Sequence, residues 1–438
     1  MSIRLTGAGL LLLAGAVVLG SGPLLFLGGC LLLTRWGAAL WVRAVVRGLR
    51  VQRGGAGEAG AAGPLVSRAF FGGEFALEAR VSNGAALSLP WLRLRETLPA
   101  ALALPNYRLE VTALPPRGGH TLRYRLPARR RGLHAVGPLY LTVGDPLGLE
   151  ERSLVAGEPT YLLVYPRVMS LTELDLPSAA LLGSLRARRP LVGDPSRFAG
   201  VRAYQRGDAV HDVHWRATAA QGRLQVRQYD AATETQTTVF LNLDAGAYVG
   251  RGWRSAHAVE LAITCAASLA WALEERRQPV GLIATGALAL PPRREAGDLL
   301  PLAVLGRTPA PTEVVDGARE VAWWPGGAHL ASGKGRGHLM RALEALARLD
   351  VAPGDTFARA VLDQAARLPW GATAVVVTGA VDERLWAALH RLREAGARVL
   401  VVLIDEGAAV AAARRQAQLV GVKLWAVWHE DSLTAGPL

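Results

Sequence analysis

The chain has 438 residues, enough for two or three domains of ordinary size. Hydrophobic residues make up 51% of it, and the formal net charge of +13 is carried almost wholly by arginine. Arginine suits phosphate or carboxylate binding, although GC-rich codon usage explains the same bias. The two cysteines, Cys30 and Cys265, form no CxxC pair, which excludes a disulfide framework and a zinc site built on thiolates.

The N-terminus is predicted to be a transmembrane helical hairpin within residues 1–50. The 30 residues between Arg4 and Arg35 carry no charge, whereas a single membrane-spanning helix needs only about 20. The sequence Gly20-Ser21-Gly22-Pro23 interrupts this run. We therefore expect one helix over Leu5–Leu19 and a second that begins at Pro23.

The flanking arginines predict the orientation of this hairpin. Arg4 precedes it, and four arginines follow it at positions 43, 47, 50 and 53. The positive-inside rule places both flanks in the cytoplasm, which a hairpin satisfies and a single span does not. We expect a multi-pass protein of the cell membrane whose soluble domains face the cytoplasm. A single span and a cleaved signal peptide stay open as alternatives.

Residues 51–64 are predicted as a Gly/Ala-rich linker, followed by an all-β sandwich over residues 65–165. Glu74–Val81 and Leu122–Leu126 alternate apolar and polar residues, as half-buried strands do. Asn83-Gly84 is a typical hairpin-turn pair. Residues 166–236 connect to an α/β domain over residues 237–438, where continuous apolar strands alternate with helices. That pattern predicts a parallel sheet covered on both faces.

The segment Gly193–Asp230 combines arginine, aspartate, histidine and tryptophan, and we call it the hallmark segment. Asp208 as the N-cap and Gly222 as the stop predict one helix between them. On such a helix His211, His214 and Trp215 share a face.

Three interpretations of the hallmark segment compete. The histidines could bind a metal, although no third ligand is visible. Histidine with Asp208 or Asp212 could perform acid–base catalysis, as in a hydrolase. In the third interpretation the segment is a docking element: Trp215 anchors the helix on the sheet, and arginines pair with Asp208, Asp212, Asp230 or a partner's acids. The dense arginines also permit nucleic-acid binding, but aromatic residues for base stacking are sparse.

The hallmark segment resembles that of the bacterial domain of unknown function 58 family. A Gly-Asp pair is followed in that family by a motif with tryptophan, a basic residue and alanine. The matching residues here are Arg202, Tyr204, Gly207, Asp208, His214, Trp215, Arg216 and Ala219. His211 departs from the pattern, because a basic Arg or Lys is more usual there. Arg131-Gly132, Gly137-Pro138, Asp145–Leu149 and Val164–Pro166 also resemble the family.

The resemblance implies a membrane-anchored protein with a von Willebrand A-like (Rossmann-type) α/β domain, often encoded beside a MoxR-type AAA+ ATPase. It implies no reaction. The metal site of such domains requires D-x-S-x-S, a threonine and a later aspartate, whose oxygens suit Mg²⁺. Here Asp244 and Thr356 match, but Gly246 and Tyr248 replace the serines and Thr378-Gly379-Ala380 lacks the aspartate. We therefore expect no resident cofactor, with Asp244 and Thr356 as weak candidates for Mg²⁺.

These observations together predict a membrane-anchored scaffold or adaptor. It docks a cytoplasmic protein, a MoxR-type ATPase, through the hallmark residues Arg202, Tyr204, Gly207, Asp208, His211, His214, Trp215 and Arg216. The alternatives are a hydrolase-type enzyme that uses His211, His214 and Asp208, and a basic-surface nucleic-acid binder. No catalytic residue is assigned.

Overall fold

The computed structural model describes most of the chain: residues 2–55, 66–156, 159–171, 198–205, 208–229, 236–249, 254–288, 303–305, 321–324 and 326–434. These residues divide into two compact units. The first contains residues 1–167, 288–319 and 343–349, and the second contains residues 168–287, 320–342 and 350–438. Each unit is described by itself.

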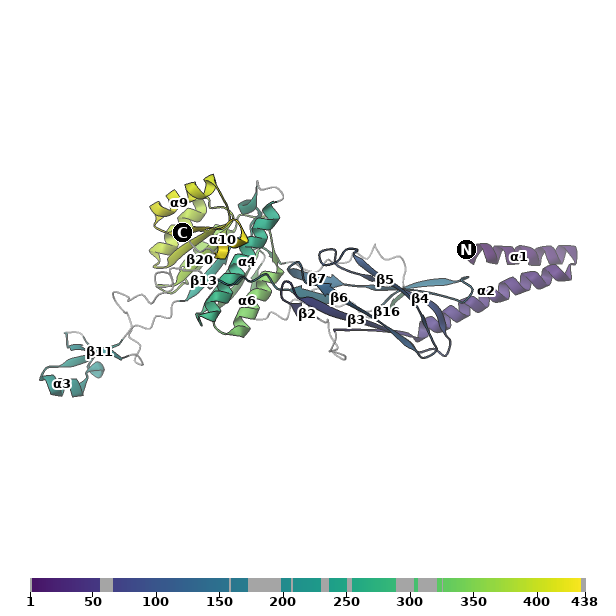
Figure 1. Cartoon of the computed structure of the whole chain (residues 1–438), viewed down its shortest axis with the longest axis horizontal. Helices are drawn as coiled ribbons and strands as arrows, with labels where there is room; N and C mark the ends of the chain where they lie inside the picture. The colour runs from purple at the N-terminus through teal and green to yellow at the C-terminus, as the bar shows by residue number, and fades with distance from the viewer. Residues whose placement is uncertain are drawn as a thin grey trace. The chain divides into compact units, whose positions relative to one another are not determined.

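The first unit begins with two apolar helices, α1 (Ser2–Leu19) and α2 (Gly22–Gly48) (Figure 1). Gly20, with φ +62°, separates them, and Pro23 lies in the first turn of α2, where proline is tolerated. The helices contact each other through small residues. A Cβ atom added to Gly28 would lie 3.0 Å from Leu13 Cγ, so glycine at this position permits the close approach.

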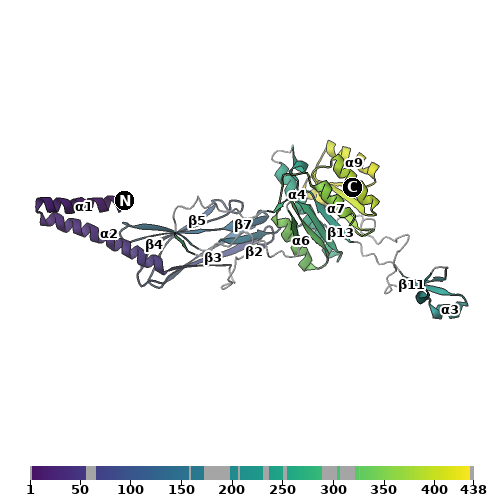
Figure 2. The same ribbon diagram turned by 180° about the vertical axis from the view of Figure 1, so that it is seen from behind.

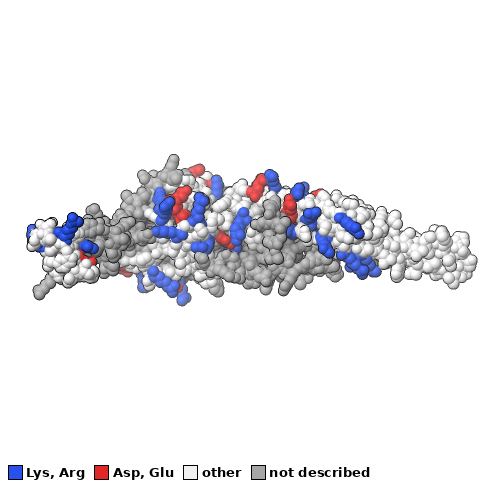
Figure 3. Space-filling view, turned by 90° about the horizontal axis from the view of Figure 1, so that it is seen from below, with Lys and Arg blue, Asp and Glu red and all other residues white. Residues whose placement is uncertain are grey.

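Two helices of the described residues are long and apolar enough to cross a membrane, α2 and α4 (Arg254–Glu275). The apolar window of α4 is 78% buried, as in a soluble core helix, whereas that of α2 is 17% buried. On the face that Figure 3 shows, the tip of the α1–α2 pair is drawn white, without blue or red side chains, and blue Lys or Arg side chains begin toward the strand-rich region. The membrane candidate is therefore α2, which α1, a shorter apolar helix, contacts.

A strand-rich region follows, with most of its strands in three sheets. Their orders are β1-β3-β6, β2-β10-β7 and β16-β9-β8-β4-β5. The strands are β1 (Leu49–Gly55), β2 (Val66–Ala69), β3 (Glu74–Asn83), β4 (Leu89–Thr97), β5 (Tyr107–Leu114), β6 (Gly119–Pro127), β7 (Gly132–Val136), β8 (Leu139–Gly144), β9 (Glu151–Ala156), β10 (Thr160–Val164) and β16 (Ala303–Leu305).

The first and third of these sheets share one apolar core. Val81 and Leu122 contribute from one sheet, and Leu94 and Leu141 from the other, all with at most 1% exposure. Buried and more exposed residues alternate along β3 and β6, as the alternation of apolar and polar residues in the sequence predicted. The predicted linker at residues 51–64 begins instead as a strand, because Leu49–Gly55 pairs antiparallel with β3. The rest of that linker lies outside the described residues.

The Asn83-Gly84 pair is a correction to the hairpin prediction. β3 pairs with β1 and β6, and the next strand, β4, belongs to another sheet. The Asn83 side chain is buried, accepts from the Ala85 amide at 3.0 Å, and donates to the Leu87 carbonyl at 2.9 Å. Asparagine here fixes a longer connection between sheets rather than a two-residue turn.

The second unit contains a mixed seven-stranded sheet of order β17-β18-β14-β13-β20-β21-β22. Its strands are β13 (Thr237–Leu241), β14 (Val280–Thr285), β17 (Ala322–Trp324), β18 (Gly327–Gly333), β20 (Thr373–Thr378), β21 (Arg398–Leu403) and β22 (Lys423–Ala426). The helices that accompany these strands are α4, α6 (Arg336–Arg348, of which residues 343–348 belong to the first unit), α7 (Phe357–Ala365), α8 (Glu383–Glu394) and α9 (Ala408–Val420). Among the short elements, η2 (Ala245–Tyr248) and α10 (Glu430–Thr434) belong to the second unit. The two-residue strands β15 (Ala287–Leu288) and β19 (Leu349–Asp350) each have one residue in either unit.

The five strands from β14 to β22 in this order are parallel. Strands β13, β14 and β20 are buried along their whole length, in agreement with their continuous apolar runs. The sheet is not parallel throughout, because β18 runs antiparallel to β14 and β17 antiparallel to β18. Helices cover both faces: α4 and α9 lie on opposite sides of the central strands in both ribbon views (Figures 1 and 2). This architecture sets the ends of β13 and β20 side by side, where Asp244 and Thr378 lie.

Candidate functional site

The hallmark segment folds into a small module of residues 198–205 and 208–229, the hallmark module. Strands β11 (Phe198–Ala203) and β12 (Gln225–Tyr229) pair antiparallel. Between them lie a 3₁₀ turn, η1 (Val210–Asp212), and a short helix, α3 (Trp215–Gln221). The predicted helix from Ala209 to Gln221 is therefore wrong in its first half.

The helix is interrupted because the chain folds back on β12 at residues 213 and 214. Val213 forms an isolated β-bridge with Val226, and both side chains are buried. The His214 amide donates to the Gln225 carbonyl at 2.7 Å. A β-branched residue with an apolar cross-strand partner favours this extended conformation over a helical one.

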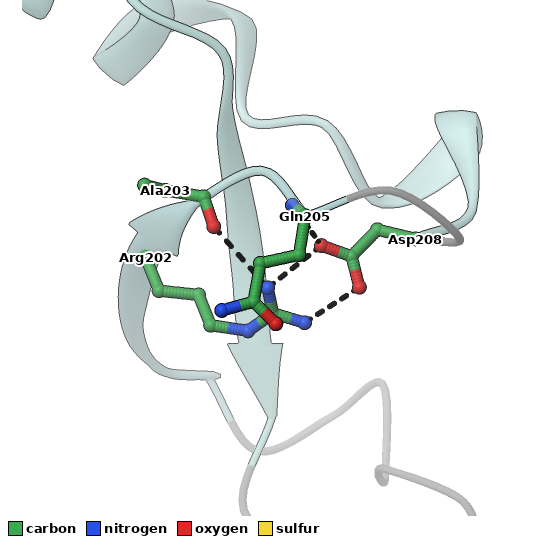
Figure 4. Close-up of polar contacts among 4 residues, drawn as sticks. All are labelled: Arg202, Ala203, Gln205 and Asp208. Carbon is green, nitrogen blue, oxygen red and sulfur yellow. Dashed lines mark hydrogen bonds and ion pairs between the residues drawn. The ribbon is translucent and has the colours of Figure 1, made fainter.

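Asp208 is not the N-cap of that helix; it is the acceptor at the centre of a loop clamp (Figure 4). Arg202 donates through both terminal nitrogens, Nη1 to Oδ2 and Nη2 to Oδ1, each at 2.7 Å. The Gln205 amide donates to Oδ2 at 2.8 Å, and Arg202 Nη1 also reaches the Ala203 carbonyl at 3.2 Å. A bidentate, charge-assisted pair with an added amide is a specific geometry.

The clamp shifts the titration of both partners. Hydrogen bonding from Arg202, and then from the Gln205 amide, lowers the pKa of Asp208 to about 2. The hydrogen bond to Asp208 raises the pKa of Arg202 further above its ordinary value. Both groups are charged at neutral pH and engaged with each other, so this pair holds the loop between β11 and η1.

Helix α3 is capped at both ends by hallmark residues. His214 Nδ1 accepts from the Ala217 amide at 3.1 Å, an N-cap that requires Nδ1 to be unprotonated. Gly222 ends the helix with φ +66°, as the sequence predicted. Thr218 Oγ1 accepts from the Gln225 amide at 3.0 Å and joins α3 to β12.

His211, His214 and Trp215 do not share a helical face, because the turn at Val213 separates them. His211 lies in η1 with its side chain 83% exposed and its Nε2 3.6 Å from Asp212 Oδ1. Trp215 is the first residue of α3 and is 66% exposed. The prediction that Trp215 anchors the helix on the sheet is therefore wrong.

The remaining predicted residues surround this framework. Tyr204 is half-buried and its amide donates to the Leu224 carbonyl at 2.9 Å. Arg216 is exposed, while Gly207 and Asp230 lie outside the described residues. Sequence reasoning missed Gln205 and Val210; the latter is 70% exposed. Arg202, Asp208 and His214 are thus engaged within the module, and Trp215, Val210 and exposed arginines lie at its surface.

The geometry does not assemble an acid–base site from His211, His214 and Asp208. The Asp208 carboxylate is bound by Arg202 and the Gln205 amide. His214 Nδ1 is bound by the Ala217 amide. Grooves among the described residues lie elsewhere: one of about 1090 Å³ between α8 and α9, and one of about 530 Å³ beside Trp428 at the start of α9.

Asp244 and Thr356, the candidate Mg²⁺ ligands, do lie together at the end of β13. Asp244 is 4% exposed; its Oδ2 accepts from the Thr356 amide at 2.7 Å and the Phe357 amide at 2.9 Å. Thr356 Oγ1 lies 3.4 Å from Oδ1. The carboxylate therefore caps the start of α7, where the helix dipole already supplies positive charge.

These residues do not fit a resident Mg²⁺ ion. The Tyr248 ring occupies the place beside the loop after β20: a Cβ on Gly379 would lie 2.7 Å from Tyr248 Cδ1. Tyr248 Oη donates to the Asn242 carbonyl at 2.7 Å. Thr378 Oγ1 donates to the Ala380 carbonyl at 2.7 Å and accepts from Asn242 Nδ2 at 3.0 Å. The Asp244 carboxylate and the Thr378 hydroxyl, which a cation would need, already accept hydrogen bonds from protein donors.

Residues 200–312 match the model of the family described as protein of unknown function DUF58. The match covers about a quarter of the chain, and over that stretch the chain is similar to this family. The match begins in β11 of the hallmark module and extends through β13, α4 and β14. It confirms the family that the hallmark residues predicted.

Comparison with curated proteins gives no match. Solved structures match about a quarter of the chain. A CARDB domain from Pyrococcus furiosus is 18% identical with a TM-score of 0.19, over 26% of this chain and 86% of that chain. A β-glucosidase from Listeria innocua is 14% identical with a TM-score of 0.16, over 26% and 16%. The DNA glycosylase AlkC from Pseudomonas fluorescens is 11% identical with a TM-score of 0.16, over 26% and 30%. These similarities carry no argument about fold or function.

Two of the upstream motifs have structural roles within the first unit. Arg131 Nη1 donates to the carbonyl of Leu346 in the last turn of α6 at 3.2 Å and to that of Leu349, just after the helix, at 2.6 Å. Such a cation satisfies carbonyls that a helix end leaves unpaired. Asp145 is buried and accepts from the Leu147 and Glu150 amides at 2.8 and 2.6 Å. It fixes the turn between β8 and β9.

Proposed function

We propose that this DUF58 protein is a membrane-anchored scaffold that docks a protein partner through the hallmark module. The observation that carries the proposal is the exposed tryptophan on a module whose shape is fixed from within. Arg202, Asp208 and His214 hold the loop and the helix, and none of them is arranged for catalysis. Trp215 and Val210 are left 66% and 70% exposed.

The composition of this surface favours a protein partner. Tryptophan and arginine dominate the binding energy of protein interfaces, and Arg216, Arg223 and Arg227 are exposed on the same module. The apolar interior of the module is small, with Val213 and Val226 as its buried aliphatic residues. So small a core supplies little stability, and binding to a partner would add to it. An acidic patch on the partner would complement the arginines.

The identity of the partner and the topology complete the proposal. The resemblance to the family supports a MoxR-type AAA+ ATPase as the partner. The α1–α2 pair would form a transmembrane hairpin that keeps a β-sandwich and a degenerate von Willebrand A-like domain at the cytoplasmic face. The parallel order β14-β13-β20-β21-β22 and the Asp244–Thr356 pair support that domain assignment. The domain is proposed to be degenerate because the oxygens that would bind a cation at its metal site are engaged by protein donors.

Capture of the ATPase by the full-length protein tests the docking role. We expect Trp215→Ala to reduce capture at least about tenfold, because truncating a central interface tryptophan costs on the order of 2 kcal/mol or more. Asp208→Ala should also reduce capture by releasing the loop that precedes α3. The matched control is Trp428→Ala, which removes a tryptophan that is 52% exposed in the other described part of the second unit.

The result is interpreted only for variants with unchanged thermal unfolding. Unchanged capture by folded Trp215→Ala protein removes the hallmark module from the docking role. Equal loss in the Trp428→Ala protein indicates a nonspecific effect of tryptophan removal and also argues against the module.

A further inference from the structure

The turn between β8 and β9 lies against α2 at the point where the uncharged run of that helix ends. Arg35, the first charged residue after that run, forms an ion pair with Glu150 at 2.8 Å. Both side chains are largely buried, at 18% and 28% exposure. Trp36, the next residue of α2, is 68% exposed. Arginine and tryptophan are the residues that mark the boundary of a bilayer.

The same turn presents an apolar side chain to solvent. Leu147 is 66% exposed, although its backbone is held firmly: Asp145 accepts from the Leu147 and Glu150 amides, and Gly148 adopts φ +67°. The Glu150 carboxylate that pairs with Arg35 belongs to this turn, three residues after Leu147. The turn is thus closed by the hydrogen bonds to Asp145, joined to α2 by the ion pair, and apolar at its tip.

We propose that the Asp145–Glu150 turn is a lipid-contacting surface, in which Leu147 enters the boundary between lipid headgroups and acyl chains. This proposal rests on the proposed membrane anchor. If α2 enters the bilayer N-terminal to Arg35, the ion pair holds the turn at headgroup depth, and Leu147 gains apolar contacts there. An isolated exposed leucine is ordinary on a protein surface. Leu147 differs because the ion pair ties its turn to the polar end of the apolar helix α2, and this position favours lipid as the group that it contacts.

The strand register supplies a matched control leucine. β4 and β8 are antiparallel, with Trp91 opposite Gly144 and Glu96 opposite Leu139. The turn after Gly144 therefore lies at one end of β4, and the loop after Thr97 lies at the other. Leu104 in that distant loop is 89% exposed and should remain in water.

Depth-dependent quenching tests the proposal on the full-length protein in phosphatidylcholine–phosphatidylglycerol vesicles. Leu147→Cys and Leu104→Cys are each made with Cys30→Ser; Cys265 is buried and can stay. Each protein is labelled with an environment-sensitive fluorophore. We expect a blue shift and strong quenching by headgroup-region nitroxide lipids at position 147, and neither at position 104. Glu150→Gln should reduce the quenching at 147 by releasing the turn from α2.

A third label separates this proposal from the anchor on which it rests. Cys30 is exposed on α2 and can be labelled in the otherwise unchanged protein. Quenching at Cys30 by acyl-chain nitroxides without quenching at 147 overturns the turn proposal and leaves the anchor intact. Absence of quenching at Cys30 overturns the anchor and the turn together. Equal quenching at 147 and 104 also overturns the turn proposal, because it indicates nonspecific adsorption.

Discussion

At the level of single residues, the fold of the hallmark module depends on which donor binds the Asp208 carboxylate, the amides of a following helix or the Arg202 guanidinium. An aspartate after glycine, before a run without Pro or Gly, predicts an N-cap. Arg202 prevails because it offers two charge-assisted hydrogen bonds to Asp208, six residues away. No pattern of spacing predicts that pairing, since it depends on the loop geometry. His214 takes over the cap, a role that its residue type does not predict.

The clamp predicts an unusual titration. The folded-state pKa of the Asp208 carboxyl group lies below its ordinary value near 3.8, so its ionisation stabilises the folded state at pH values above about 3.8. The stabilisation is lost as the pH falls through the folded-state pKa of about 2. The carboxyl carbon resonance of Asp208, in protein with labelled aspartate, should therefore titrate near pH 2. In Arg202→Gln protein its midpoint should return toward 3.8. A wild-type midpoint near 3.8 would show that the pair does not persist in solution.

At the level of elements, the buried parallel strands were the most predictable. The apolar run Thr373–Thr378 became β20 with those bounds, and Asp382 caps α8 through the Leu385 amide at 2.8 Å. Helices α7, α9 and α10 and the antiparallel strands β17 and β18 were not predicted. In α9 alanines replace the larger apolar residues that reveal helical periodicity, and β18 begins and ends with glycine.

The start of α7 supports a test of the Asp244 assignment. Asp244→Ala leaves the Thr356 and Phe357 amides without their acceptor, which should cost roughly 1–3 kcal/mol of unfolding free energy. Asp244→Asn retains one acceptor oxygen and should cost less. Added Mg²⁺ should not raise the Tm of the wild-type protein, since a bound ion would stabilise the folded state. A Mg²⁺-dependent rise that Asp244→Asn abolishes would restore the metal site.

At the level of the whole molecule, the sequence predicted the apolar helices and the class of each region, but not how strands from distant segments combine. β16 pairs with β9, although about 150 residues separate them. Such pairing depends on tertiary contacts, and its sequence signal of three residues is too short to detect.

Membrane association is the prediction at this scale. The full-length protein should remain with membranes after an alkaline carbonate wash. Leu25→Arg with Phe26→Arg places two charges on exposed apolar positions of α2 and should shift protein to the soluble fraction. Each charge at mid-bilayer costs about 2.5–3.5 kcal/mol on insertion scales. Leu104→Arg, at a more exposed leucine, should have no effect. Wild-type protein in the soluble fraction would contradict the anchor.

Helix α2 extends without a break from its apolar half into the core of the strand-rich region, where Val42 and Val45 are at most 1% exposed. Its 27 residues form one continuous helix of about 40 Å, with no loop between the apolar half and the half that packs in the strand-rich core. Only about 20 Å separates Gly22 from Arg35, against a hydrocarbon thickness of about 30 Å. In the proposed topology, a thicker or thinner bilayer would change the tilt of α2. Because α2 continues into its core, the strand-rich region would rotate together with the helix. Lipid composition would then set the angle between this region and the plane of the bilayer.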